Sequence, residues 1–167
     1  LNNTLTIATG VLSVLFIIYG YRLGGYILKR ELTNAAYKKT LESTGSTKAM
    51  PIPVSLFMWA FSMWLYTAET SAVTYRIINR AQDNVFAWLG AVIMAVAIVG
   101  EATADKQKSA AKKVNPKRFC DTGLYKIVRC PNYFGEILFW TGVTVSALDI
   151  LQGVGQWITV IIAYILI

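Results

Sequence analysis

The chain has 167 residues and a mass of 18.5 kDa, which is within the size of one domain. Hydrophobic residues make up 55% of it and charged residues only 15%, against about 25% charged in soluble proteins. This composition argues against a soluble globular domain and excludes disorder. Four stretches carry no charge, and each is close to the roughly 17 to 25 residues that a helix needs to cross a bilayer. They are 1–21, 49–68, 84–100 and 150–167.

The predicted elements are all helices. The first span covers residues 5–21, and Pro51 and Pro53 open the second, which runs to residue 74, because proline is tolerated in the first helical turn. The remaining spans cover 85–104, 131–148 and 154–167, and the intervening loops are 33–50, 75–84 and 105–129. We therefore expect an all-α, multi-pass transmembrane helical bundle of about five spans. We expect one integral-membrane domain over residues 1–167, truncated at its C-terminus, and leave truncation at the N-terminus open.

The charges lie between the spans, so the net charge of +7 does not indicate a nucleic-acid partner. The segment from Arg22 to Lys48 carries +4 and the segment from Asp105 to Arg129 carries +6, whereas residues 75–84 carry only +1. Alternating spans place the two strongly basic segments on one face, which the positive-inside rule makes cytosolic. The sequence therefore predicts an integral membrane protein among membrane lipids, with its basic loops facing the cytosol.

Histidine is absent, which excludes His-based acid–base catalysis and serine triads and removes the commonest metal ligand. Cys120 and Cys130 lie ten residues apart with no second pair. Neither a zinc site nor a disulfide framework is indicated, so we expect two reduced thiols and no metal site.

Carboxylates in or beside an apolar span need an explanation, because an unpaired charge there is costly. Glu69 lies in the second predicted span and Glu136 in the fourth. Glu101 and Asp105 are four residues apart and share one helix face. For Asp105 alone, a solvated helix end is an equal alternative.

A dense group of polar residues opens the fourth span. Pro131 is expected to start the helix, whose N-terminal N–H groups attract a phosphate together with Lys126 and Arg129. Asn132 and Glu136 are four residues apart on one face, where they could hydrogen-bond an amide or a ribose.

Two tyrosines, Tyr125 and Tyr133, belong to the same group. Each could stack on a ring or donate a proton. The alternative for each alone is an interfacial belt that anchors the span.

Two motifs carry a family resemblance: EATADKQK at 101–108 and R-x-PNYFGE at 129–136, with Gly-Leu-Tyr at 123–125 and W-x-G at 140–142. On these residues the chain resembles the steroid 5-alpha-reductase C-terminal family, in particular its bacterial-type branch, catalogued as DUF1295. That family is more distantly related to the isoprenylcysteine carboxyl methyltransferases. The resemblance is specific over residues 96–142 and covers about two thirds of the chain.

The resemblance implies an oxidoreductase that uses NADPH to reduce an activated carbon–carbon double bond in a steroid-like or other lipid. The catalytic residues that we predict are Glu69 and Tyr133, as donors to a substrate carbonyl. No G-x-G-x-x-G fingerprint occurs, so the nicotinamide site is not of the Rossmann type. The predicted cofactor-binding residues are Glu101, Asp105, Lys113, Tyr125, Lys126, Arg129, Asn132, Tyr133 and Glu136.

One position departs from the family pattern. Family members usually read Arg-His-Pro-Asn-Tyr, whereas this chain has Cys130 in place of the histidine. A thiol donates hydrogen bonds weakly, so the departure bears on cofactor affinity and on turnover.

Two other functions stay open. An S-adenosylmethionine-dependent isoprenylcysteine-type methyltransferase would share the Arg-x-Pro-x-Tyr core. A non-catalytic membrane subunit, belonging to a membrane-protein assembly, would have kept the fold and lost turnover. Asn132, together with Phe-Gly-Glu at 134–136, favours the reductase.

Overall fold

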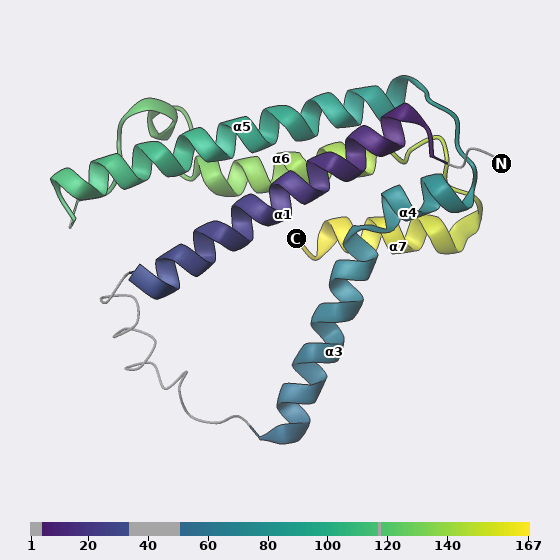
Figure 1. Ribbon diagram of the computed structural model, residues 1–167, viewed down its shortest axis with the longest axis horizontal. Coiled ribbons are helices and arrows are strands. Elements are labelled where there is room, and N and C mark those ends of the chain that lie inside the picture. Colours follow the sequence, from purple (N-terminus) through teal and green to yellow (C-terminus); the bar gives the residue numbers. More distant parts are fainter. Residues whose placement is uncertain (1–4, 34–50, 117) are drawn as a thin grey trace. The chain divides into compact units, whose positions relative to one another are not determined.

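The computed structural model describes residues 5–33, 51–116 and 118–167, and within these ranges it contains helices and no strand. The all-α prediction is therefore confirmed for the described part of the chain. The elements in order are α1 (Ile7–Thr33), α3 (Ile52–Glu69), α4 (Ser71–Ile78), α5 (Val85–Val114), the 3-10 helix η1 (Gly123–Lys126), α6 (Pro131–Val145) and α7 (Gly153–Ile165) (Figure 1).

Three helix boundaries differ from the predicted ones. The helix α1 continues past residue 21 to Thr33, and α5 continues past residue 104 to Val114. The extension of α1 contains Leu, Arg, Lys and Glu, and that of α5 contains Lys, Ala and Gln; these are good helix formers, so the apolar stretch ends before the helix does. The second predicted span is interrupted at Thr70, where α3 gives way to α4. The predicted loop at 33–50 falls almost entirely outside the described residues.

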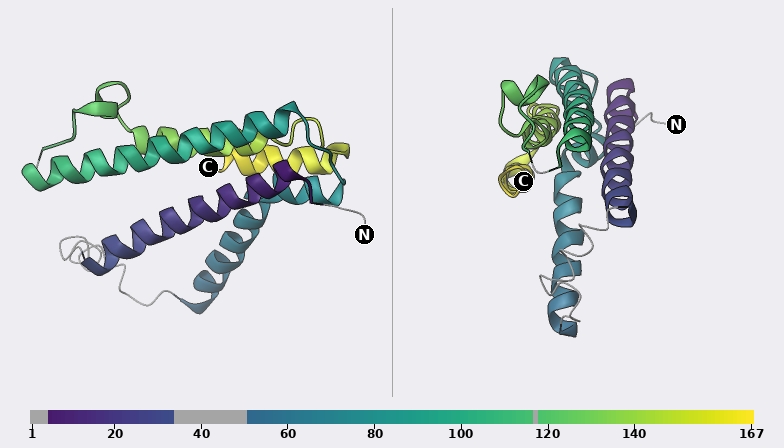
Figure 2. Two further views of the ribbon diagram at one scale, coloured as in Figure 1. Left: turned by 45° about the horizontal axis from the view of Figure 1, so that its top comes forward. Right: turned by 90° about the vertical axis from the view of Figure 1, so that its left-hand side faces the viewer.

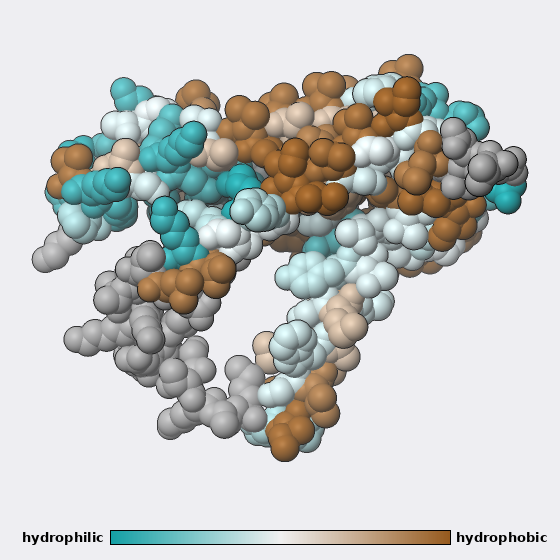
Figure 3. Space-filling model, viewed as in Figure 1, coloured by the Kyte–Doolittle hydropathy of each residue, from teal (hydrophilic) through white to brown (hydrophobic). Residues whose placement is uncertain are grey.

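Two helices in the described ranges are long and apolar enough to cross a membrane, over Ile7–Tyr26 and Val85–Val114, and α7 is a shorter apolar helix. Hydrophobic residues gather along the middle of α5 and hydrophilic ones towards its last turns (Figure 3). These features support a membrane location. The number of five spans stays a prediction.

The chain divides into two compact units, Leu1–Leu15 with Ala68–Ile167, and Phe16–Thr67. In the second unit, apolar side chains of α3 are largely exposed, with 69% for Phe57 and 71% for Trp59. A helix that exposes apolar residues on this scale is typical of a lipid or protein contact surface rather than of a water-facing one.

Within the first unit, α5 and α6 lie side by side along most of the length of α6 (Figure 2). Two glycines bring them together: a Cβ atom on Gly90 would lie 2.5 Å from the carbonyl oxygen of Gly142, and one on Gly142 would lie 2.8 Å from that of Gly90. Gly135, one turn into α6, similarly faces the buried Glu101, with 3.0 Å between its hypothetical Cβ and that of Glu101. Small residues at such a contact let two backbones approach closely, as is common between membrane helices.

Arg76 connects the elements around the start of α5. Its side chain is fully buried, and three of its nitrogens donate hydrogen bonds. Nε donates to Thr9 Oγ1 at 3.3 Å, and the two terminal nitrogens donate to the carbonyls of Ser146 at 3.0 Å and Gln82 at 2.9 Å. A buried guanidinium is tolerated when its donors are satisfied in this way. The contacts tie α4 to the beginning of α1 and to the end of α6.

Two carboxylates, those of Asp83 and Asp149, act at the same end of the first unit as Arg76. Both oxygens of Asp83 accept the backbone N–H of Ala8 at 3.2 Å, which stabilises the N-terminus of α1. Burial lowers the pKa of the Arg76 guanidinium from its ordinary value, and the charges of Asp149 and Asp83 oppose that shift. Charge at this end therefore serves to hold helices together.

The close approach of α5 and α6 predicts unequal effects for two glycines of the same helix. Gly90→Ala should destabilise the protein by about 1–3 kcal/mol, because its methyl group overlaps the α6 backbone. Gly100→Ala, which meets no atom within 4 Å, should be neutral or stabilise by about 0.5–1 kcal/mol. Thermal unfolding followed by tryptophan fluorescence in detergent compares them, and equal melting temperatures would contradict the packing described.

Candidate functional site

A pocket of about 760 Å³ lies where α5 ends and α6 begins. Its volume falls in the range of about 300–1,000 Å³ that is common for small-molecule sites. The lining residues come from α5, the following loop, η1 and the first turn of α6: Lys108, Lys112, Phe119, Cys120, Tyr125, Lys126, Arg129, Cys130, Asn132 and Tyr133.

Four of the lining residues are cationic and none is acidic. Lys108 and Lys112 are four residues apart on one face of α5, and Lys126 and Arg129 approach from the other wall. The first turn of α6 adds its free N–H groups, with Pro131 at the first helical position as predicted. This combination favours a ligand that carries several negative charges, such as phosphates.

A short chain of hydrogen bonds fixes the inner wall of the pocket. The Tyr125 hydroxyl donates to Oδ1 of Asn132 at 2.9 Å, and Nδ2 of Asn132 donates to Oδ1 of Asp105 at 3.1 Å. The network joins η1, α6 and α5 at one point. Asn132, which we predicted to hydrogen-bond an amide or a ribose, is thus oriented by the protein and retains one amide hydrogen and one acceptor position for a ligand.

Gln107 holds η1 against α5. Its Oε1 accepts the backbone N–H of Leu124 at 2.9 Å. Gly123 has φ +61°, so a larger residue would be strained in its backbone, and its Cβ would displace the Gln107 amide that holds Leu124. This contact explains why glycine precedes Leu-Tyr in the motif.

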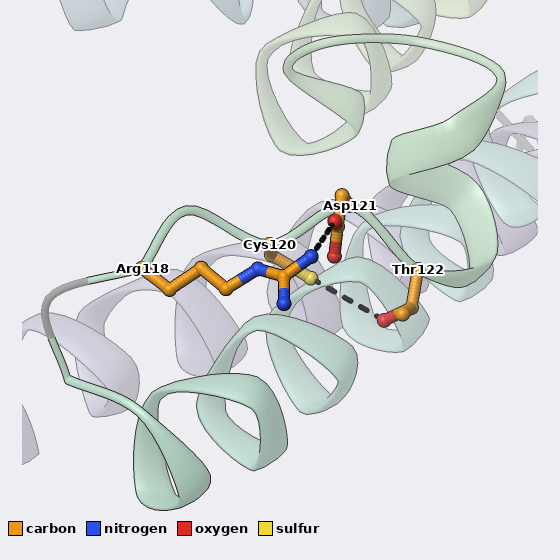
Figure 4. Close-up of polar contacts among 4 residues, drawn as sticks. All are labelled: Arg118, Cys120, Asp121 and Thr122. Atoms are coloured by element: carbon orange, nitrogen blue, oxygen red, sulfur yellow. Dashed lines mark hydrogen bonds and ion pairs between the residues drawn. The ribbon is translucent and has the colours of Figure 1, made fainter.

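The loop that leads from α5 to η1 is held by charged groups. Nζ of Lys112 donates to the carbonyl oxygens of Pro116 at 2.9 Å and Arg118 at 2.8 Å. Figure 4 shows the side chain of Arg118 directed at Asp121, with which it forms an ion pair, and the sulfur of Cys120 directed at Thr122. The loop therefore presents Cys120 as part of the pocket wall.

The structure brings together five of the predicted cofactor-binding residues around this pocket, and Asp105 lies behind them. These five are Tyr125, Lys126, Arg129, Asn132 and Tyr133. Glu101 is buried against Gly135, and the exposed Lys113 is not among the lining residues. Both stay predictions as cofactor contacts.

Sequence reasoning missed Lys108 and Lys112 as pocket residues, and also Phe119 and Cys120. The sequence predicts a loop from residue 105 onwards, whereas α5 continues to Val114. The spacing of four between the two lysines was the available signal, since it places them on one face once the segment is helical.

The two remaining carboxylates lie elsewhere in the same unit. Glu69, at the end of α3, lines a small cavity of about 10 Å³, room for about one water molecule, together with Trp140 and Tyr164. Glu136 is half-buried one turn beyond Asn132 on α6, close enough for its charge to act on Glu69. The predicted catalytic residues Glu69 and Tyr133 thus line different cavities.

A family described as "Protein of unknown function (DUF1295)" matches residues 1–167. The chain belongs to the DUF1295 family. It is also similar to a steroid 5-alpha-reductase, DET2 of Gossypium hirsutum, with 28% identity over 105 residues, which is 60% of this chain. The 105 matched residues cover 41% of that relative's length, so the chain matches less than half of it. No solved structure matches.

Neighbouring lysines of this DUF1295 chain give a direct test of the pocket. Lys108→Ala should weaken binding of a phosphate-bearing ligand about fivefold, or roughly 1 kcal/mol, because it removes one cation from the lining. Lys106→Ala, exposed and outside the lining, should change it little. Titration with NADPH at low salt measures both, and a larger effect at Lys106 would contradict the placement of the pocket.

Proposed function

We propose that this protein is a membrane-embedded, NADPH-dependent reductase of an enone carbon–carbon double bond in a steroid-like or other lipid. The observation that carries the proposal is the pocket with four cations, no carboxylate and a helix N-terminus in its lining. Membership of DUF1295 and the similarity to a steroid 5-alpha-reductase support a reductase of this kind.

The lining suits the phosphates of NADPH. Lys108, Lys126 and Arg129 neutralise several charges, and the first turn of α6 supplies N–H donors. The number of cations favours a ligand with a third phosphate at the 2′ position. When bound, NADPH supplies a hydride.

The polar side chains around the pocket orient the remainder of the cofactor. Asn132, fixed by Tyr125 and Asp105, offers its remaining amide hydrogen to a ribose or carboxamide oxygen. Glu136, four residues further on the same helix, extends this polar strip towards the apolar part of the bundle.

A donor near the lipid would polarise the substrate carbonyl. Glu69 is our candidate, since it lies at the end of α3 beside the apolar residues of its cavity. Tyr133 is the second candidate, because it lines the pocket and is 69% exposed. In either case, the residue donates a hydrogen bond to the oxygen that gains charge.

The membrane arrangement follows from the same charges. We propose about five spans, with the basic end of α5 on the cytosolic side. The pocket then opens where a water-soluble anionic cofactor can reach it, while the apolar segments of α5 and α7 lie among membrane lipids that can deliver the substrate.

S-adenosylmethionine fits this lining less well. It carries a cationic sulfonium and no phosphate, so four cations without a carboxylate would repel its reactive centre. A methyltransferase, like a non-catalytic subunit, is an outcome that the binding experiment tests.

Purified protein in nanodiscs should enhance NADPH fluorescence and melt at a higher temperature with NADPH than without it. Asn132→Ala and Glu136→Ala should lose NADPH binding by at least about tenfold, or 1.4 kcal/mol, with their ligand-free melting temperatures retained. Tyr125→Phe, which removes only the hydroxyl that orients Asn132, should cause a smaller loss.

Wild-type affinity in both alanine variants would contradict the assigned residues. A response to S-adenosylmethionine but not to NADPH would replace the reductase by a methyltransferase. If neither NADPH nor S-adenosylmethionine binds, a non-catalytic membrane subunit remains as the alternative.

A further inference from the structure

Both cysteines of the chain lie in the wall of the cationic pocket. Cys130 is exposed, whereas Cys120 is half-buried with its sulfur 3.7 Å from Oγ1 of Thr122. From the sequence we expect two reduced thiols ten residues apart, with Cys130 in place of the family's histidine. Their common position in one cavity gives them a shared chemical environment instead.

That environment favours an anionic reaction partner for Cys130. The residue lies between Arg129 and Pro131 at the N-cap of α6, a helix of 15 residues, and its side chain makes no capping hydrogen bond. Lys108, Lys112 and Lys126 line the same cavity. A concave site with four cations raises the local concentration of anions and speeds their encounter with the thiol.

We propose that Cys130 is a modification site that forms a mixed disulfide with anionic low-molecular-weight disulfides, of which oxidised glutathione is the type. The Cys130 thiol loses its proton to water, and the thiolate attacks one sulfur of the disulfide. A new S–S bond forms as the old one breaks. The leaving sulfur takes the electron pair and departs as a thiolate, so Cys130 is oxidised and half of the reagent is reduced.

The four cations assist this step as well as the encounter. During the attack, negative charge spreads over three sulfur atoms, and it develops in the cavity that the four cations line, at the N-terminus of α6. The bound half of the reagent brings its own carboxylates, which then pair with the lysines.

The consequence is a reversible block of the pocket. The adduct occupies space and neutralises charge that an anionic cofactor would use, and a reducing thiol removes it by the reverse exchange. This consequence rests on the proposed function, whereas the formation of the adduct does not.

The test compares disulfides of different charge on the full chain in nanodiscs. Oxidised glutathione is anionic and cystamine is cationic. To correct for their different intrinsic reactivity, the rate of adduct formation on the protein is divided by the rate at which the same disulfide reacts with a small neutral thiol in solution. Intact mass spectrometry follows the adduct. At low salt the normalised rate for oxidised glutathione should exceed that for cystamine at least about tenfold, and the ratio should collapse at about 1 M salt. Equal normalised rates would overturn the proposal.

Variants and peptide mapping locate the reaction. Cys130→Ser should abolish the fast adduct, and the matched variant Cys120→Ser should retain it. Lys126→Ala should slow the anionic reagent several-fold and leave the neutral reagent 2,2′-dithiodipyridine unaffected. Peptide mapping of the wild-type adduct gives the same answer without a variant, and an adduct on Cys120 alone would overturn the assignment.

The two proposals fail in different ways. If the unmodified protein does not bind NADPH but Cys130 still reacts preferentially with the anionic disulfide, the proposed function fails and the modification site stands. If the modified protein binds NADPH as tightly as the unmodified one, the block is overturned.

Discussion

The close contact between α5 and α6 is the constraint on which the rest of the first unit depends. Gly90 and Gly142 remove the side chains that would separate the two backbones, and Gly135 does the same opposite Glu101. With the helices in this register, Asp105 comes within hydrogen-bond distance of Asn132. The pocket thus depends on packing along the whole of α6, from Gly135 beside the polar lining residues to the Gly90–Gly142 contact in the last turn of the helix.

The two ends of α5 use charge in different ways. Near its start, Arg76 is buried and its donors are satisfied by protein acceptors, so this charge holds α4 to neighbouring elements. Near its end, four cations surround a cavity, and a cofactor's anionic groups can compensate them. The proposed function needs such a division, because a water-soluble hydride donor and a membrane lipid approach from different phases. The thiol of Cys130 lies on the side of the cationic pocket.

The sequence predicted the helical class, the start of α6 at Pro131 and the group from Tyr125 to Tyr133, because each depends on local patterns of proline, charge and apolar residues. It did not predict that α5 continues through residues 105–114, since a run of charge ends an apolar span without ending a helix. The role of Arg76 was also beyond prediction, because its acceptors on Thr9 and Ser146 lie 67 and 70 residues away along the chain. Lys108 and Lys112 line the pocket because η1 packs against α5, and this contact between separate elements is not visible in the sequence.

The most direct measurement of the central claim is an electron cryomicroscopy structure of the full-length protein in nanodiscs with NADPH added. The account predicts nucleotide density between the end of α5 and the first turn of α6, with phosphates beside Lys108, Lys126 and Arg129 and the nicotinamide directed towards Glu136. Density for NADPH at another place on the protein, or a pocket that stays free of nucleotide at saturating NADPH, would contradict it.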